Sequence, residues 1–178
     1  VSGWFGDDWI YSLRTEKGLK GSSFIAGTIM LSQYQPVDML MYYDARPCGM
    51  NGMFSTDFVC DRLKGYYPFW MFNRLYQLGT AVPVSCEDPD LVACAARGEA
   101  GMAFMLTHFR DVKEGDAKEI CVAYDGLDGK PYKLTYYLLD ETHDAAIYRT
   151  ETVSGISGES YLTLPLFTTV LVTMEPLR

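Results

Sequence analysis

Reactive side chains follow a short apolar run near residue 40. The run Val37–Tyr43 ends at Tyr43 and is followed by Asp44 and Arg46. A buried strand would ordinarily give way to a short polar turn at this point. Asp44 and Arg46 are two residues apart, so both point to the same face of an extended chain. They can form an ion pair with each other, or they can present a carboxylate and a planar set of donors to a ligand such as a sugar. The Tyr43 ring can stack on that ligand or pack in a core.

Two further groups of residues are candidates for a binding site. Aromatic and acidic side chains gather near the amino terminus, at Trp4, Asp7, Asp8 and Trp9. Trp4 can form the floor of a sugar subsite, or an exposed apolar patch. The loop Cys48–Phe54, which contains Asn51, is apolar for a surface connection. That composition suits the wall of a binding cleft, or packing against another part of the protein.

The cysteines and histidines do not form a metal-binding motif. The five cysteines contain no Cys-X-X-Cys pair, and an odd number cannot all pair within one chain: Cys48, Cys60, Cys86, Cys94 and Cys121. We expect reduced thiols that pack as small hydrophobic groups, rather than a nucleophile. Neither His108 nor His143 has a second histidine or a cysteine three or four residues later. The sequence therefore predicts no metal and no other cofactor.

The composition excludes several classes of partner. The chain has 178 residues, 48% of them hydrophobic, with a net charge of -8 and a pI near 4.7. Such a chain folds, and it lacks the basic surface that binds a phosphate backbone. The longest apolar run, Phe24–Leu31, is shorter than the ~20 residues of a membrane-spanning helix. We expect a soluble, cytoplasmic protein with neither nucleic acid nor a membrane as partner.

The first 80 residues have the pattern of α/β structure. Leu19–Gln33 is apolar nearly all round and contains small residues, which predicts a helix packed closely on a sheet. Val37–Tyr43 predicts a strand that is buried on both faces. Pro68 predicts the first turn of a further helix, which Gly79 ends.

The rest of the chain has the pattern of short strands separated by turns. Asp-Gly and Ser-Gly pairs punctuate it. Eight strands are predicted, near Val82–Cys86, Leu91–Ala96, Met102–Phe109, Lys118–Tyr124, Tyr132–Leu139, Ala146–Val153, Tyr161–Leu164 and Thr168–Met174. This density of strands is typical of a β-sandwich. We therefore expect two parts that pack against each other, residues 1–80 and 81–178.

One strand between two helices is too little for a complete sheet. A helix, a strand and a helix followed by a sandwich are the expected end of a (β/α)₈ barrel, which needs ~250 residues in all. The predicted fold class is therefore α/β plus all-β, with most of the barrel absent. Functional groups of such barrels lie where the strands end, so Tyr43, Asp44 and Arg46 are expected at the rim of an active site.

Three segments resemble a known family. GDDWIYSLRTEKGLKGSSFIAG, MLMYYDARPCGMNGMF and KGYYPFWMFNRLYQLG are similar to the C-terminal third of bacterial glycoside hydrolases related to family 39, the β-xylosidase and α-L-iduronidase group. The tail with Tyr161–Pro165 and Thr169–Val172 is similar to their accessory sandwich. The resemblance implies a carbohydrate substrate and contact with the remainder of the barrel. It also implies that Trp4 and its neighbours lie in the loop after the seventh barrel strand.

The resemblance implies a retaining mechanism with two glutamates ~5 to 5.5 Å apart. The family carries one glutamate in an Asn-Glu pair after the fourth strand and the other after the seventh strand. No position here matches either one, and Glu16, the first glutamate, lies in a charged turn. Because the chain starts with Val1 and not with a methionine, further sequence is expected upstream. We expect a β-xylosidase-like hydrolase that is active only when complete.

The alternative is a non-catalytic β-sandwich that binds carbohydrate or serves a structural role. Such a binding module needs a row of exposed aromatic side chains on one face of the sandwich. Tyr132, Tyr136 and Tyr148 are the candidates for this row.

Overall fold

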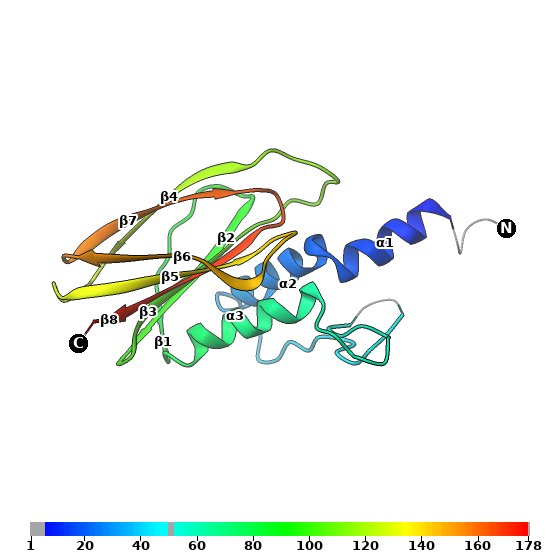
Figure 1. Ribbon diagram of the computed structural model, residues 1–178, viewed down its shortest axis with the longest axis horizontal. Coiled ribbons are helices and arrows are strands. Elements are labelled where there is room, and N and C mark those ends of the chain that lie inside the picture. Colours follow the sequence, from blue (N-terminus) through cyan, green and yellow to red (C-terminus); the bar gives the residue numbers. More distant parts are fainter. Residues whose placement is uncertain (1–5, 50–51, 178) are drawn as a thin grey trace.

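The computed structural model describes residues 6–49 and 52–177. The described chain begins with α1 (Asp7–Lys17), α2 (Leu19–Ser32), the short 3-10 helix η1 (Lys64–Tyr66) and α3 (Tyr67–Tyr76) (Figure 1). The strands follow, namely β1 (Thr80–Val82), β2 (Leu91–Gly98), β3 (Gly101–His108), β4 (Lys118–Asp125), β5 (Pro131–Leu139), β6 (Asp144–Ser154), β7 (Ser157–Leu164) and β8 (Thr169–Pro176). Helices and strands are thus segregated along the chain.

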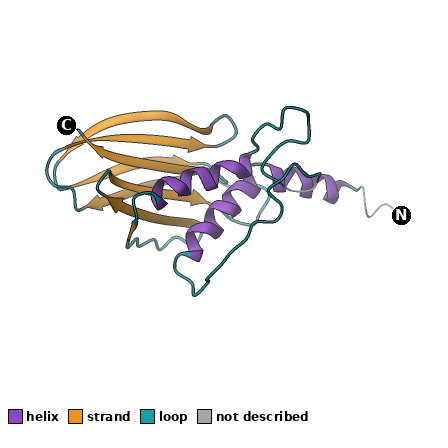
Figure 2. Cartoon of the chain, turned by 90° about the horizontal axis from the view of Figure 1, so that it is seen from below, coloured by secondary structure: helices purple, strands orange, loops and turns teal. Residues whose placement is uncertain are grey.

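The strands form two antiparallel sheets. The larger sheet has the order β1-β2-β3-β8-β5-β6, and the smaller sheet pairs β4 with β7. The central strands β3 and β8 are buried along most of their length. Figure 2 shows α2 and α3 on one face of the larger sheet and α1 extending beyond it, and buried side chains of β7 pack against its other face. The larger sheet is therefore the middle layer of three.

Alternate residues of the central strands supply two separate cores. In β3, Ala103 and Met105 pack on the helix side, whereas Phe104 and Leu106 pack on the side of β4 and β7. This alternation is the two-residue period of a strand. The helices complete the first core with fully buried side chains, among them Met30 and Met71.

Most predicted elements are present close to their expected positions. The helix expected at Leu19–Gln33 is α2, and the helix expected after Pro68 is α3. Seven of the eight predicted strands occur near their expected positions. The strand expected near Val82–Cys86 was wrong, because residues 83–86 form no strand and β1 ends at Val82. The sandwich is unequal, because its second sheet has only two strands.

The amino-terminal helix α1 was not predicted. Asp7, Asp8 and Trp9 were expected in a loop and Glu16 in a turn, but the structure places all four in this helix. The charged side chains at its two ends favour the helix. Asp7 and Asp8 lie in the first turn, and the basic side chains of α1 lie in its last turn, so both ends complement the helix dipole.

The prediction of a buried strand at Val37–Tyr43 was wrong for this chain. The structure assigns no strand to residues 37–43, and Met39 and Met41 are 75% and 80% exposed. No neighbouring strand accompanies this segment among the described residues. An apolar run becomes a buried strand only when other strands pair with it, and here they are lacking.

A lysine joins the helical part to the sheet. The Lys64 ammonium donates hydrogen bonds to the backbone oxygens of Asp140, at 2.6 Å, and His143, at 3.2 Å. It also forms an ion pair with the Asp144 carboxylate at 2.7 Å. All three partners belong to the turn between β5 and β6 or to the start of β6. Lys64 thus fixes η1, and with it the start of α3, against one end of the larger sheet.

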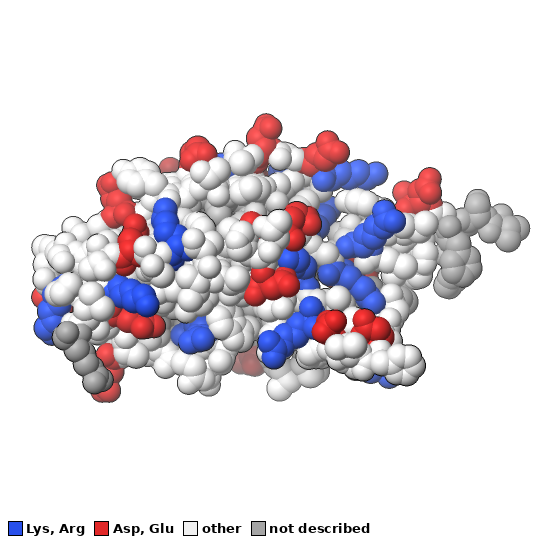
Figure 3. Space-filling model, in the orientation of Figure 1, with Lys and Arg blue, Asp and Glu red and all other residues white. Residues whose placement is uncertain are grey.

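The surface carries charges of both signs. On the face shown in Figure 3, acidic and basic side chains are interspersed rather than gathered into one basic surface. Within residues 6–49 and 52–177, no helix has both the length and the apolar character needed to cross a membrane.

Candidate functional site

The predicted site residues lie in the connection between α2 and α3. Figure 1 shows this connection leaving the end of α2, running back toward the end of the molecule where α1 lies, and turning there into α3. We call residues 42–49 the rim and residues 53–63 the finger. Both lie near the start of α3, and the rim overlaps the end of the exposed segment 37–43.

Asp44 and Arg46 of the rim form an ion pair. Arg46 Nε lies 2.5 Å from Asp44 Oδ2, and the Arg46 backbone N–H donates to Asp44 Oδ1 at 3.1 Å. The hydrogen bond from the Arg46 side chain lowers the pKa of Asp44, and the carboxylate raises the pKa of Arg46. Asp44 is therefore a carboxylate at neutral pH and cannot donate a proton. The Arg46 side chain is 74% exposed and therefore open to a ligand, whereas the Asp44 side chain is only 12% exposed.

The two rim tyrosines have different roles. Tyr43 is 82% exposed, so it is not a core residue. The Tyr42 hydroxyl accepts a hydrogen bond from the Gly52 N–H at 3.4 Å. The Tyr42 ring packs edge-on against the Phe69 ring, with 5.7 Å between the ring centroids. Tyr42 thereby anchors the rim on α3. The predicted site residues Trp4 and Asn51 lie outside the described residues.

Two contacts that the sequence analysis missed hold the rim in shape. Lys17, in the last turn of α1, donates to the backbone oxygen of Cys48 at 2.5 Å. Gly52 has a φ of +113°, and a Cβ there would lie 2.6 Å from the backbone oxygen of Arg46. Only glycine fits this conformation and this close approach. The Asn51-Gly52 pair was the available sequence signal for it.

The finger is a small loop with paired arms. The Leu63 N–H donates to the Met53 carbonyl at 2.8 Å, and the Ser55 N–H donates to the Asp61 carbonyl at the same distance. The Asp61 N–H returns a bond to Ser55 Oγ at 2.8 Å. These bonds cross the base and the middle of the loop, so the finger is an ordered projection.

A large hollow lies away from the rim. It has a volume of about 1050 Å³ and separates the β1–β3 side of the larger sheet from β4 and β7. Its lining is mainly apolar and includes Ile120, Val122 and Phe104. We interpret it as the part of the sandwich that the two-stranded sheet leaves uncovered. Among the described residues, no three His, Cys, Asp or Glu side chains converge in a way that could hold a metal ion.

The aromatic row required by a binding module does not form from the predicted tyrosines. Tyr132 and Tyr136 are 8% and 0% exposed, and Tyr148 is 40% exposed. The Tyr136 hydroxyl donates to the Glu151 carboxylate and lies 2.6 Å from Ser160 Oγ. Burial raises the pKa of Tyr136 to about 12. Two of the three candidates are thus part of the sandwich interior.

Comparison with known proteins identifies the fold. No protein-family model matches the sequence, and no curated protein sequence matches it. Among solved structures, the GH39 enzyme from Xanthomonas axonopodis pv. citri is similar, with a TM-score of 0.75 and 13% identity over 93% of this chain and 42% of that enzyme. A bacterial orthologue of human α-L-iduronidase gives a TM-score of 0.71 and 12% identity over 95% of this chain and 40% of that protein. A GH30 endoxylanase from Clostridium papyrosolvens gives a TM-score of 0.67 and 13% identity over 91% of this chain and 39% of that enzyme.

These similarities concern the fold, because the identities are low. They agree with the resemblance that the sequence motifs indicated. The chain spans about two fifths of the length of the three structures. It therefore has the fold of a partial region of glycoside hydrolases of the family 39 and family 30 type.

Proposed function

We propose that this chain is the C-terminal part of a retaining, β-xylosidase-like glycoside hydrolase that cleaves glycosidic bonds only when complete. In this proposal residues 1–80 belong to the end of a (β/α)₈ barrel, and residues 81–178 form its accessory sandwich. The observation that carries the proposal is the exposed apolar segment 37–43, which ends at the rim.

The composition of this segment suits a barrel strand. Val37 and Leu40 are 49% and 55% exposed, in addition to Met39 and Met41. Strands of a parallel barrel are apolar on both faces, because side chains fill the interior on one face and helices cover the other. A soluble protein rarely exposes such a run without a partner. Neighbouring barrel strands from the rest of the protein would cover it.

The helices beside the segment support the same arrangement. The chain passes from α2 through segment 37–43 to α3. Figure 1 shows segment 37–43 and α3 running in opposite directions, as the strand and helix of a βα unit do. One side of α2 is buried on the larger sheet through Ala26 and Met30. Its other side leaves Phe24 and Leu31 58% and 50% exposed. Further barrel helices would cover these side chains.

The chemistry of the rim suits binding of a sugar rather than cleavage. The rim has one carboxylate, Asp44, which Arg46 neutralises, whereas retaining hydrolysis needs two carboxyl groups with different protonation. A sugar hydroxyl can donate to Asp44 and accept from Arg46. The exposed Tyr43 ring can pack on the apolar face of a pyranose. In this proposal these three residues hold the substrate, and the two glutamates come from the rest of the protein.

The test compares the complete protein with the isolated chain. The complete protein is expected to hydrolyse para-nitrophenyl β-xyloside with retention of the anomeric configuration, measured by proton NMR of the first product. The isolated chain is expected to be inert. Turnover by the isolated chain, persisting after separation from host glycosidases, would overturn the proposal. So would a complete protein that cleaves no aryl glycoside.

A further inference from the structure

The core between the two sheets is closed on the side of β7 and open on the side of β4. The inward side chains of β7 include Leu162 and Leu164, which are 3% and 1% exposed. The inward side chains of β4 are only partly buried, namely Ile120, Val122 and Tyr124. The hollow of about 1050 Å³ lies beside them, whereas packed protein interiors have few voids larger than a water molecule. The core is therefore incomplete on the side of β4.

The larger sheet is uncovered at the same place. Three residues of β2 border the hollow and are only partly buried, namely Leu91, Ala93 and Ala95. One strand further into the sheet, Phe104 and Leu106 of β3 are 7% and 3% exposed. The two alanines are small, so they leave room for larger apolar side chains above them. The uncovered apolar surface therefore lies between β2 and β4.

The backbone of β4 has an unused edge. β4 pairs with β7 only, and within residues 6–49 and 52–177 no backbone group outside this pair bonds to the β4 backbone. The opposite edge of the small sheet differs, because the Arg149 guanidinium donates to the backbone oxygen of Tyr161 at 3.3 and 3.4 Å. An open edge presents a row of N–H and C=O groups to which another strand can bond.

The hollow runs along this open edge. It is lined by six consecutive residues of β4, residues 120–125, and on its far side by residues 82–86. Successive side chains of a strand point to opposite faces, so only the edge of β4 can present all six residues to one space. Residues 83–87 on the far side are exposed. The space beside β4 is therefore bounded by a strand edge, an apolar floor and an exposed segment.

We infer that a strand from the part of the complete protein outside these 178 residues adds to the edge of β4 and fills the hollow. The inference rests on the proposed function only in that this chain belongs to a longer protein. The chain spans about two fifths of the solved structures that it resembles, so more than half of a protein of that length lies outside it. Main-chain hydrogen bonds of an added strand would satisfy the edge, and its alternate side chains would fill the hollow.

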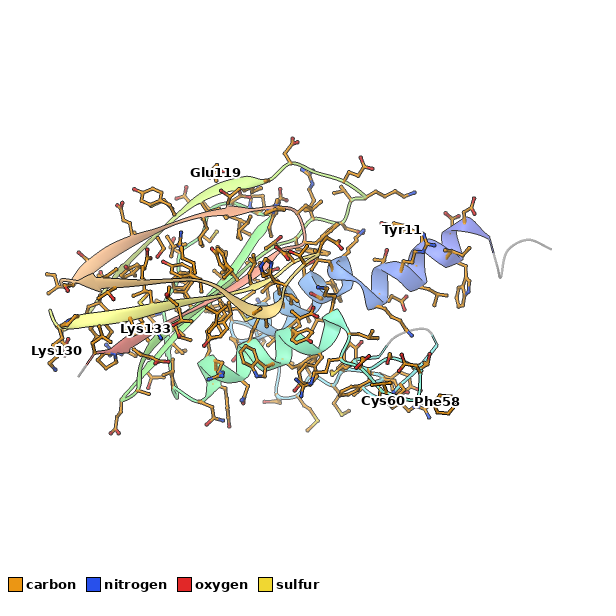
Figure 4. The ribbon with its side chains drawn as sticks, viewed as in Figure 1. Tyr11, Phe58, Cys60, Glu119, Lys130 and Lys133 are labelled. Carbon is orange, nitrogen blue, oxygen red and sulfur yellow. The ribbon has the colours of Figure 1, made fainter. Side chains whose placement is uncertain are left out.

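The surroundings of the edge predict the pattern of this strand. Six residues of strand span ~20 Å, which matches the length of β4 along the hollow. Every second side chain should be apolar and lie over β2. The outward positions of β4 and β7 include Glu119, Asp125 and Glu159 but no lysine or arginine, and Figure 4 shows Glu119 on the outer side of β4. The other side chains of the strand should therefore be polar and preferably basic.

Hydrogen exchange of β4 in the complete protein and in the isolated chain tests the inference. About half of the amides of a strand point away from its single antiparallel partner. In the isolated chain these β4 amides should exchange rapidly, and in the complete protein at least ~100-fold more slowly, measured by mass spectrometry of a peptide that covers β4. β8 is the internal control, because it bonds to β3 and β5 on its two sides and should exchange equally slowly in both proteins.

Two substitutions on opposite faces of β4 form a matched pair. Val122→Lys places an ammonium in the hollow. In the isolated chain this group can reach water, whereas in the complete protein the added strand would bury it without a partner. Val122→Lys should therefore return the outward β4 amides of the complete protein to rapid exchange and leave the circular dichroism spectrum of the isolated chain unchanged. Ala123→Lys lies on the outer face and should keep the protection.

The possible failures are distinguishable. Equally rapid exchange of the outward β4 amides in both proteins would overturn the inference. Protection that survives Val122→Lys would also overturn it, because nothing would then fill the hollow. Protection that appears in the isolated chain as its concentration is raised would assign the edge to a second copy and likewise reject the inference. These readouts need no substrate, so a complete protein that cleaves no aryl glycoside would overturn the proposed function alone.

Discussion

Replacing Lys64 by methionine should weaken the attachment of the helices to the sheet. The substitution keeps the apolar length of the side chain and removes the ammonium that binds the oxygens of Asp140 and His143 and the carboxylate of Asp144. Only 20% of the Lys64 side chain is exposed. Water therefore replaces the lost donor poorly. The Asp140 oxygen loses the donor that Lys64 supplies, whereas the His143 oxygen keeps the bond that it accepts from the Asp140 N–H at 3.2 Å.

The magnitude follows from these contacts. Leaving a partly buried acceptor without its hydrogen bond costs ~1–3 kcal/mol. The ion pair contributes less than ~1 kcal/mol, because the Asp144 side chain is 53% exposed and solvent screens it. We expect the free energy of unfolding to fall by about 2–3 kcal/mol in total.

Urea unfolding of the 178-residue chain, followed by tryptophan fluorescence, measures this difference. A matching thermal melt should show Tm lowered by ~5–10 °C. Lys130→Met is the control, because Lys130 is 67% exposed and pairs with Asp128 of the same turn. Its expected change lies within ~0.5 kcal/mol. If the Lys64→Met and Lys130→Met variants unfold at the same urea concentration, the proposed role of Lys64 in docking the helices is refuted.

Further predictions concern the rim and the thiols. In the complete protein, Asp44→Ala and Arg46→Ala should each lower kcat/KM by about tenfold, as expected for a lost charged contact to substrate, and should lower Tm only slightly, because solvent screens the exposed ion pair; unchanged kinetics would remove both from the site. Because Arg46 lowers the pKa of Asp44, the pair stabilises the fold at neutral pH and loses this effect as the pH falls through the pKa of folded Asp44. Arg46→Ala should raise that pKa in an NMR titration. Burial raises the pKa of Cys94 to about 12, so a thiol reagent at neutral pH should label the exposed Cys60, Cys86 and Cys121 in the native chain, and Cys94 only after unfolding.

The sandwich could be predicted from the sequence because its signals are local. Asp125-Gly126 and Ser154-Gly155 mark turns, and both glycines adopt the positive φ that such turns need. The strand Thr168–Met174 was predicted from its β-branched residues, and β8 lies there, buried on both faces. Helix α1 was missed because its apolar residues are few and its charged ends were interpreted as a loop.

The segment 37–43 and the contacts of the rim could not be predicted in the same way. An apolar run indicates burial but does not say which neighbour provides it, and the described chain provides none for this run. The bond from Lys17 to Cys48 spans 31 residues, and the bond from Lys64 to Asp140 spans 76. Contacts at such separations leave no periodic signal in the sequence. The pairing of Asp44 with Arg46 was foreseen as one of two possibilities, because two residues of an extended chain fix their shared face.

Hydrogen exchange at the backbone amides of residues 37–43 tests the central claim most directly. If this segment is a barrel strand, its amides bond to neighbouring strands in the complete protein. In the isolated chain they remain in water, apart from the Val37 N–H, which donates to the Gln35 oxygen at 2.8 Å. Mass spectrometry of the peptide that covers it should then show exchange slowed at least ~100-fold in the complete protein, and rapid exchange in the isolated chain. Equally rapid exchange in both proteins would contradict the account, because the segment would then have no strand partners in either one.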